Sequence, residues 1–324
     1  MSADRTVGGS GSRDGVVVPP AEVASYYGRP VLKPPGGEWK IAAYLFTGGL
    51  AAGTAVLAAG ADLVGAPRLR RVSWLGSFGA LLASLVLLVE DLGRPERFHH
   101  MLRVAKPTSP MSVGTWILTA FGPGVGAAAV WELLPARWRP SWPARLLRAV
   151  SRGVGLASAA TAPGVATYTA ALLSQTAVPG WNEVRRELPF VFGGSAAAAG
   201  GGFGMIAAPL TEAGPARIFA ATGAAGELLA SQVMERRMGL IREVYHHGAA
   251  GRRRRAADVL TAAGLAGTVL LGGRSRAGAV VSGLALLAGS ACQRFGVFEA
   301  GIESTRDPRY TVVPQRERLD RAGA

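Results

Sequence analysis

The sequence predicts an all-α integral membrane protein, a bundle of about eight transmembrane helices with both chain termini on the same side of the membrane. Two observations carry this fold class. The 324 residues are 49% hydrophobic and only 17% charged, and the apolar residues gather in long runs separated by polar loops. Much of the glycine (45 residues) lies inside those runs, and membrane helices tolerate glycine because small residues let backbones approach closely.

Eight apolar runs approach the length of about 20 residues that a helix needs to cross the hydrocarbon core. They cover residues 39–64, 72–92, 112–134, 147–175, 188–210, 216–234, 256–272 and 277–300. The seventh run is short, and a loop of only four residues separates it from the eighth. We therefore expect a flexible N-terminal arm (1–37), a transmembrane domain (38–303) and a C-terminal tail (304–324).

The positive charge indicates an orientation. An even number of spans puts both termini on one side, here called side A, together with the loops after the second, fourth and sixth runs. About two thirds of the 35 Lys and Arg residues fall on side A, so the positive-inside rule predicts a multi-pass cell-membrane protein with cytoplasmic termini. The dense run 252–255 is interpreted as a juxtamembrane signal touching anionic lipid. The net charge of +14 is not interpreted as a nucleic-acid interface.

Cysteine and histidine usage argues against a metal cofactor in this chain. Cys292 is the single cysteine, so no ligand set for an Fe–S cluster exists. The four histidines form two adjacent pairs at span ends or in loops, His99-His100 and His246-His247. Haem between membrane helices needs histidines that face one another within the spans. We expect no haem, no Fe–S cluster and no metal site.

Three runs bring polar groups to one level near side A. Tyr44 lies near the start of the first run, Glu90 and Asp91 end the second, and Tyr168 lies about two turns from the end of the fourth. If these helices are neighbours, the residues line one pocket. A phenol can donate a hydrogen bond to a quinone carbonyl, and a carboxylate can trade protons with it. His99 is a candidate proton carrier at the surface. The alternative is an ordinary polar helix end, stopped by glycine and proline after Asp91.

Carboxylates elsewhere leave two interpretations open. Glu227 lies near the middle of the sixth run and Asp62 ends the first. An intramembrane carboxylate is a functional candidate, so both are candidate relay groups for ions or protons. For Glu227 the alternative is a structural hydrogen bond to a Ser or Thr of a neighbouring helix. Glu132 is placed at the membrane interface, with Trp131 in the headgroup belt.

Several motifs in this chain resemble the NrfD family, the membrane subunits of polysulfide reductase type. The most specific are Asp91-Leu92-Gly93-Arg94-Pro95 and Pro107-Thr108-Ser109-Pro110-Met111-Ser112, supported by residues 44–53, 101–104, 168–173 and 189–190. The segments 298–301 and 307–311 resemble the branch found beside formate-dehydrogenase-like enzymes. The resemblance covers roughly residues 20–320.

The resemblance implies an eight-span subunit without a redox centre of its own. Such a subunit anchors a ferredoxin-like Fe–S subunit, which connects it to a molybdopterin catalytic subunit. It binds a quinone, menaquinone or ubiquinone, and passes electrons between the Fe–S subunit and the membrane quinone pool.

Carried over by motif, Tyr168 would be the quinone-binding tyrosine and Asp91 the acid of the second span. Tyr44 stands where a relative carries a histidine, and Arg94 would pair with Glu90 or Asp91 or face the partner. Two alternatives from other classes are a passive membrane anchor and a proton-translocating subunit without its own quinone site.

Overall fold

The computed structural model describes residue 32, residues 39–92 and residues 94–323. The predicted arm therefore lies outside the described residues, apart from Leu32, as does Gly93. The described chain is helical and contains no β-strand. Its elements are α1 (Trp39–Leu63), α2 (Pro67–Glu90), η1 (Pro95–Leu102), α3 (Pro110–Leu133), η2 (Ala136–Trp138), α4 (Trp142–Ser174), α5 (Pro179–Asn182), α6 (Leu188–Ala207), α7 (Gly214–Arg237), η3 (Gly239–Ile241), α8 (Arg242–His246), α9 (Gly248–Leu270), α10 (Arg276–Arg306) and α11 (Arg309–Gly323).

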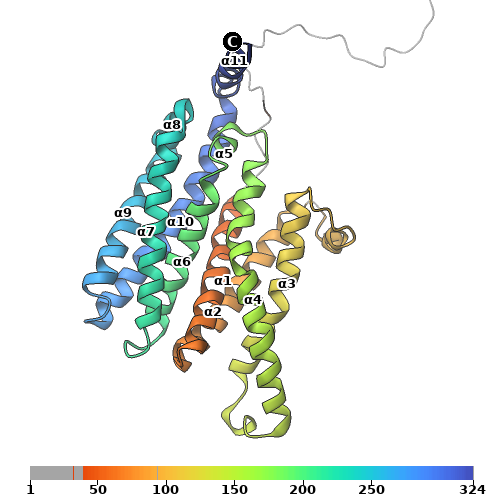
Figure 1. Ribbon diagram of the computed structural model, residues 1–324, viewed down its shortest axis with the longest axis vertical. Coiled ribbons are helices and arrows are strands. Elements are labelled where there is room, and N and C mark those ends of the chain that lie inside the picture. The colour runs from red at the N-terminus through yellow and green to blue at the C-terminus, as the bar shows by residue number, and fades with distance from the viewer. Residues whose placement is uncertain (1–31, 33–38, 93, 324) are drawn as a thin grey trace, which may run out of the picture.

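Six of the described helices are long and apolar enough to cross a membrane: α1, α2, α3, α4, α6 and α10. The other two predicted spans form α7 (24 residues) and α9 (23 residues). At 1.5 Å per residue both reach about 35 Å, and Figure 1 shows them running alongside α6 and α10. Their charged residues, among them Glu227 and Asp258, lower their apolar character. Eight spans, and the membrane side on which the termini lie, remain predictions.

Proline and serine define where helices begin. Proline lies in the first turn of α2, α3, α4 and α6, where the missing N–H costs nothing because the first turn has no intrahelical acceptor for it. Ser109 caps α3 by accepting a hydrogen bond from the Ser112 N–H at 3.4 Å. Ser275 caps α10 in the same way, from the Gly278 N–H at 2.9 Å.

The helices form two packed groups that meet along α1 and α6. The hairpin of α3 and α4 lies on one side of α1 and α2, and α7, α9 and α10 lie on the other side of α6 (Figure 1). Small residues allow the close crossing of α1 and α6. A Cβ on Gly53 would lie 2.0 Å from the carbonyl oxygen of Ala196, and one on Gly200 would lie 2.4 Å from the carbonyl carbon of Gly53.

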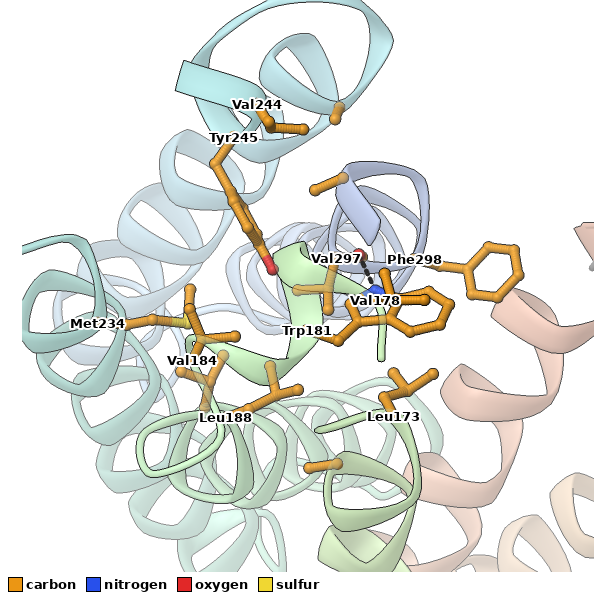
Figure 2. Close-up of a cluster of buried hydrophobic side chains, with 14 of the residues drawn as sticks. Leu173, Val178, Trp181, Val184, Leu188, Met234, Val244, Tyr245, Val297 and Phe298 are labelled. Atoms are coloured by element: carbon orange, nitrogen blue, oxygen red, sulfur yellow. Dashed lines mark hydrogen bonds between the residues drawn. The ribbon is translucent and has the colours of Figure 1, made fainter. Parts of the chain in front are cut away.

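The side-A end of the bundle is closed by the connection between α4 and α6. Trp181 of α5 donates from Nε1 to the Val297 carbonyl at 2.8 Å and stacks on Phe298 at 5.6 Å between ring centroids (Figure 2). The Tyr245 hydroxyl donates to the Gly180 carbonyl at 2.9 Å. This buried cluster ties α5 to α8 and α10, and fixes the last turns of α4 relative to the second group of helices.

Candidate functional site

A cavity of about 210 Å³ lies at the side-A end of the α1–α4 group. Its walls are the first turns of α1 and α3 and the last turns of α2 and α4, and η1 contributes to its rim. Most of the lining is apolar, and each of the four helices adds one polar side chain. The lining residues are Ile41, Tyr44, Leu87, Leu88, Asp91, Leu92, Met101, Met111, Thr115, Leu118, Tyr168 and Leu172. Tyr44, Asp91 and Tyr168 thus line one cavity, as their levels along the helices predicted.

Tyr168 is positioned by a glycine on the facing helix. A Cβ on Gly114 of α3 would lie 2.3 Å from ring atom Cε2 and 2.4 Å from Cδ2 of Tyr168. The absence of a side chain at Gly114 therefore lets the tyrosine ring lie against the α3 backbone. This contact holds the ring at the cavity wall and leaves its hydroxyl for other partners.

Three polar side chains of the cavity, those of Tyr44, Asp91 and Tyr168, have no hydrogen-bond or ion-pair partner within the described chain. Tyr44 is buried, with 7% of its surface exposed. No hydrogen bond in the described part of the chain uses the hydroxyl of Tyr44 or Tyr168, and no described cation pairs with Asp91. Thr115 is different, because its hydroxyl donates to the Met111 carbonyl at 2.9 Å. Two phenols and one carboxylate are therefore available to a bound molecule.

The other predicted site residues do not line the cavity. Glu90 is exposed and lies 3.8 Å from the Lys40 ammonium. Arg94 precedes η1 and is exposed, as is His99, whose ring meets that of His100 at 4.5 Å. Among the described residues no ion pair joins Arg94 or Arg97 to Glu90 or Asp91. These groups lie around the side-A surface near the cavity.

Comparison with protein families decides the affiliation. The family model described as "Polysulphide reductase, NrfD" matches residues 38–237, more than half of the chain and every residue of the cavity lining. The chain belongs to the NrfD family. A comparison with curated proteins found no match. The NrfD-family chain is a multi-pass membrane protein and a subunit of a quinone-linked oxidoreductase complex.

The NrfD match ends at the last residue of α7, so α8 to α11 lie beyond it. The segments 298–301 and 307–311, on which the resemblance to a formate-dehydrogenase-associated branch depends, lie in this unmatched part. The branch is accordingly not shown. In the described ranges, no group of three or more His, Cys, Asp or Glu side chains is placed to hold a metal ion.

Sequence reasoning missed much of the apolar lining of this NrfD-family cavity. Met101 of η1 and Met111 of α3 lie at its edge, and both fall within the motifs quoted above. Leu87 and Asp91 are four residues apart, so they share a face of α2. Val86 and Glu90 have the same spacing, so only the structure shows that the face of Leu87 and Asp91 is the one that lines the cavity.

Asp62 and Glu132 belong to a separate ion network at the opposite end of the NrfD-family bundle. Arg70 donates to Glu132 at 2.7 Å and to Asp62 at 3.2 Å, and Arg152 donates to Asp62 at 2.7 Å. Glu132 and Trp131 are buried within the protein, at 2% and 8% exposure, and their level at the membrane interface stays a prediction. The buried carboxylate is retained because Arg70, 62 residues away in sequence, pairs with it.

Proposed function

We propose that this subunit binds a quinone head group in the α1–α4 cavity and passes electrons between an Fe–S partner subunit and the membrane quinone pool. The observation that supports this most is the combination of an apolar cavity with three polar groups, Tyr44, Asp91 and Tyr168, that have no partner among the described residues. Ligand sites are mostly apolar, with a few polar groups that fix orientation. The cavity has room for a ring-sized head group and would leave a long apolar tail in the lipid.

The chemistry assigns different roles to the phenols and the carboxylate. Reduction of a quinone to a quinol takes two electrons, from the partner's Fe–S cluster, and two protons. Tyr168 and Tyr44 donate hydrogen bonds to quinone carbonyls, but a phenol is a poor proton carrier near neutral pH because its ordinary pKa is about 10. Asp91, exposed at the end of α2, exchanges protons between the quinone and side A. Glu90 and His99 are further groups that exchange these protons with side A.

The partner surface is placed at side A, next to the cavity. Arg94 and Arg97 flank the start of η1 and are exposed, and among the described residues neither is in an ion pair. Their positive charges complement acidic groups of a ferredoxin-like Fe–S subunit. That subunit in turn contacts a molybdopterin catalytic subunit. The segments 298–301 and 307–311 favour a complex of the formate-dehydrogenase-associated branch.

The test is quinone-linked turnover of the purified complex with Tyr168→Phe and, separately, Asp91→Asn. Loss of the Tyr168 hydroxyl removes a hydrogen bond to the carbonyl, and loss of the Asp91 carboxylate removes the proton donor. We expect quinone reduction to be abolished or greatly slowed. Transfer to a soluble dye, which takes electrons from the partner subunits directly, should be unchanged.

Matched controls exist outside the cavity. Tyr310→Phe and Asp307→Asn make the same chemical changes at side A, in residues that do not line the cavity. Both should leave quinone turnover as in the unmodified complex. A passive anchor predicts no bound quinone and only assembly defects in every variant. Normal quinone turnover in Tyr168→Phe and Asp91→Asn, with the complex intact, would overturn the assignment of this site.

A further inference from the structure

A second set of buried polar side chains lies in the group formed by α6, α7, α9 and α10, away from the cavity. Glu227 of α7 and Arg294 of α10 are almost completely buried, at 2% and 0% exposure. Within the described chain no ion pair joins them. Isolated buried charges are costly unless they are paired or hydrogen-bonded, so the surroundings of these two groups need an explanation.

Their hydrogen bonds are incomplete. Arg294 donates from Nη2 to the Phe192 carbonyl at 2.7 Å, and its guanidinium lies over the Phe192 ring at 3.6 Å from the centroid. The Ser195 hydroxyl of α6 is a hydrogen-bond partner of the Glu227 carboxylate. The hydroxyl oxygens of Ser195 and Ser290 are 2.9 Å apart. Glu227 Oε2 and two nitrogens of Arg294, Nε and Nη1, have no partner among the described residues.

Polar groups continue from Glu227 toward side A. Ser231 and Glu235 follow Glu227 at intervals of four residues on α7, so the three share one face over about 12 Å. Glu235 accepts from Arg254 of α9 at 3.0 Å and lies 3.4 Å from Nε2 of His246 of α8. Glu235 and His246 are partly exposed, with 24% and 39% of their side-chain surface accessible.

The facing helices contribute further polar groups to this row. Arg254 also pairs with Asp258 of α9 at 3.2 Å. Thr261 of α9 faces Gly289 of α10, because a Cβ on Gly289 would lie 2.6 Å from the Thr261 hydroxyl oxygen. Gln293 lies one turn after Gly289 on α10. We call the whole set the polar lane: Glu227, Ser231 and Glu235 of α7, His246 of α8, Arg254, Asp258 and Thr261 of α9, Gln293 and Arg294 of α10, and Ser195 of α6.

Most of the buried polar atoms without a partner in the described part of the chain belong to the polar lane. Seven of the eleven buried side-chain nitrogen and oxygen atoms without a partner in the described ranges belong to it: Glu227 Oε2, Ser231 Oγ, Arg254 Nη1, Thr261 Oγ1, Gln293 Nε2, and Nε and Nη1 of Arg294. Buried polar groups nearly always bond to protein or to ordered water, and a buried water needs two to four such partners. The polar lane provides them in a row.

The opposite direction from Glu227 is closed. The buried residues of α7 before Glu227 are the small apolar residues Ala216, Ala220, Gly223 and Ala224. There the backbones of α6 and α7 touch: a Cβ on Gly201 would lie 2.4 Å from the Ala220 nitrogen, and one on Gly223 would lie 2.5 Å from the Ala198 nitrogen. This dry contact has neither space nor partners for water.

We propose that the polar lane is a hydrated proton path that opens at His246 and Glu235 on side A and ends at Glu227. A proton taken up from side A at Glu235 or His246 passes through bound water and the Ser231 hydroxyl to the Glu227 carboxylate, giving the carboxylic acid. The reverse transfer returns it, and no electrons are exchanged. Because the path has one opening, Glu227 stores a proton from side A and does not by itself carry protons across the membrane.

A purely structural pairing of Glu227 would have a different geometry. The Arg70–Glu132 pair of the same molecule shows it, with a direct contact of 2.7 Å. Glu227 and Arg294 attract each other electrostatically but make no such direct contact. Each has atoms without a partner among the described residues, and further polar groups lie between them and the surface. The path does not involve the quinone cavity, so its test is independent of the proposed function.

The experiment is an infrared pH titration of the purified complex reconstituted with one orientation in liposomes. We expect one carboxylic-acid carbonyl band that titrates, shifts in D₂O, and is lost in Glu227→Gln. A pH step on side A should change this band at once, whereas a step on the opposite side should leave it unchanged. Ser231→Ala should slow the response without removing the band.

The control is Glu303→Gln, which removes a carboxylate that is 53% exposed and paired with Arg306 at side A, and it should leave the band unchanged. If Glu227→Gln fails to assemble, Glu227→Asp should move the band rather than remove it. A wild-type protein without such a band, a band insensitive to both Glu227 variants, or a band that follows the pH of the opposite side would overturn the proposal.

Discussion

Gly114→Ala should displace Tyr168 without changing any functional group of the cavity. The added Cβ would lie 2.3 Å from ring atom Cε2, whereas carbon atoms in contact are about 3.5–4.0 Å apart. The ring, α3 or both must therefore shift by about 1 Å or more in total. Tyr168 and α3 both line the cavity, so the shift changes where the hydroxyl points.

Two costs follow from this displacement. Overpacking of a well-packed contact costs about 1–3 kcal/mol of folding stability. A misplaced hydrogen bond between the tyrosine and the quinone forfeits about 0.5–1.5 kcal/mol of binding, which corresponds to a rise of about two- to tenfold in the KM for quinone. Electron transfer to a soluble dye should be unaffected, because it does not use the cavity.

The assay is quinone-linked turnover of the detergent-purified complex as a function of quinone concentration. Gly122→Ala is the control on the same helix, because a Cβ there would meet only Leu81 Cδ2, at 3.8 Å. In a Tyr168→Ala background the ring is gone, so Gly114→Ala should cause no further loss of folding stability. An unchanged KM in Gly114→Ala, or an equal rise in Gly122→Ala, would refute the argument that Gly114 acts through Tyr168.

Two further predictions concern folding. Arg70→Met should lower stability by about 3–5 kcal/mol, because it leaves the buried Glu132 carboxylate without its cation. A thermal unfolding temperature equal to that of the unmodified protein would contradict the importance of this pair. Gly53→Ala should reduce the amount of assembled protein, since its Cβ would lie 2.0 Å from the Ala196 carbonyl oxygen, whereas Gly60→Ala has no atom within 4 Å of the new Cβ. Equal yields of the two variants would contradict the close α1–α6 crossing.

The common level of Tyr44, Asp91 and Tyr168 could be predicted because it depends only on the alternating direction of the spans, whereas the packing of their helices around one cavity could not. Successive spans alternate in direction, so the start of an odd run and the end of an even run lie on the same side of the bundle. Choosing between Glu90 and Asp91 needed the faces of α2 as well. Adjacent residues of a helix point about 100° apart, and Asp91 shares its face with Leu87.

Contacts between distant segments could not be predicted from the sequence. Glu132 pairs with Arg70, which lies on another helix, and no local pattern in the sequence indicates that pair. The conformation of η1 was not predicted either, because it also depends on contacts with segments distant in sequence. Its inward residue is Met101, while His99, which the sequence made a candidate, is exposed at the surface.

The state of the polar groups separates structural from functional carboxylates in this bundle better than their position does. Asp62 and Glu227 were both relay candidates because both lie in apolar runs. Asp62 accepts from two arginines at 2.7 and 3.2 Å, and this closed network fixes α1 against α2 and α4. In the described part of the chain, one Glu227 oxygen has no partner and further polar atoms without partners follow it, and Asp91 meets no described cation. A carboxylate already bound to two guanidinium groups has little reason to take up a proton, whereas one with an open coordination can bind a proton, a water or a ligand. The same criterion therefore assigns Asp62 to the framework and supports the roles proposed for Asp91 and Glu227.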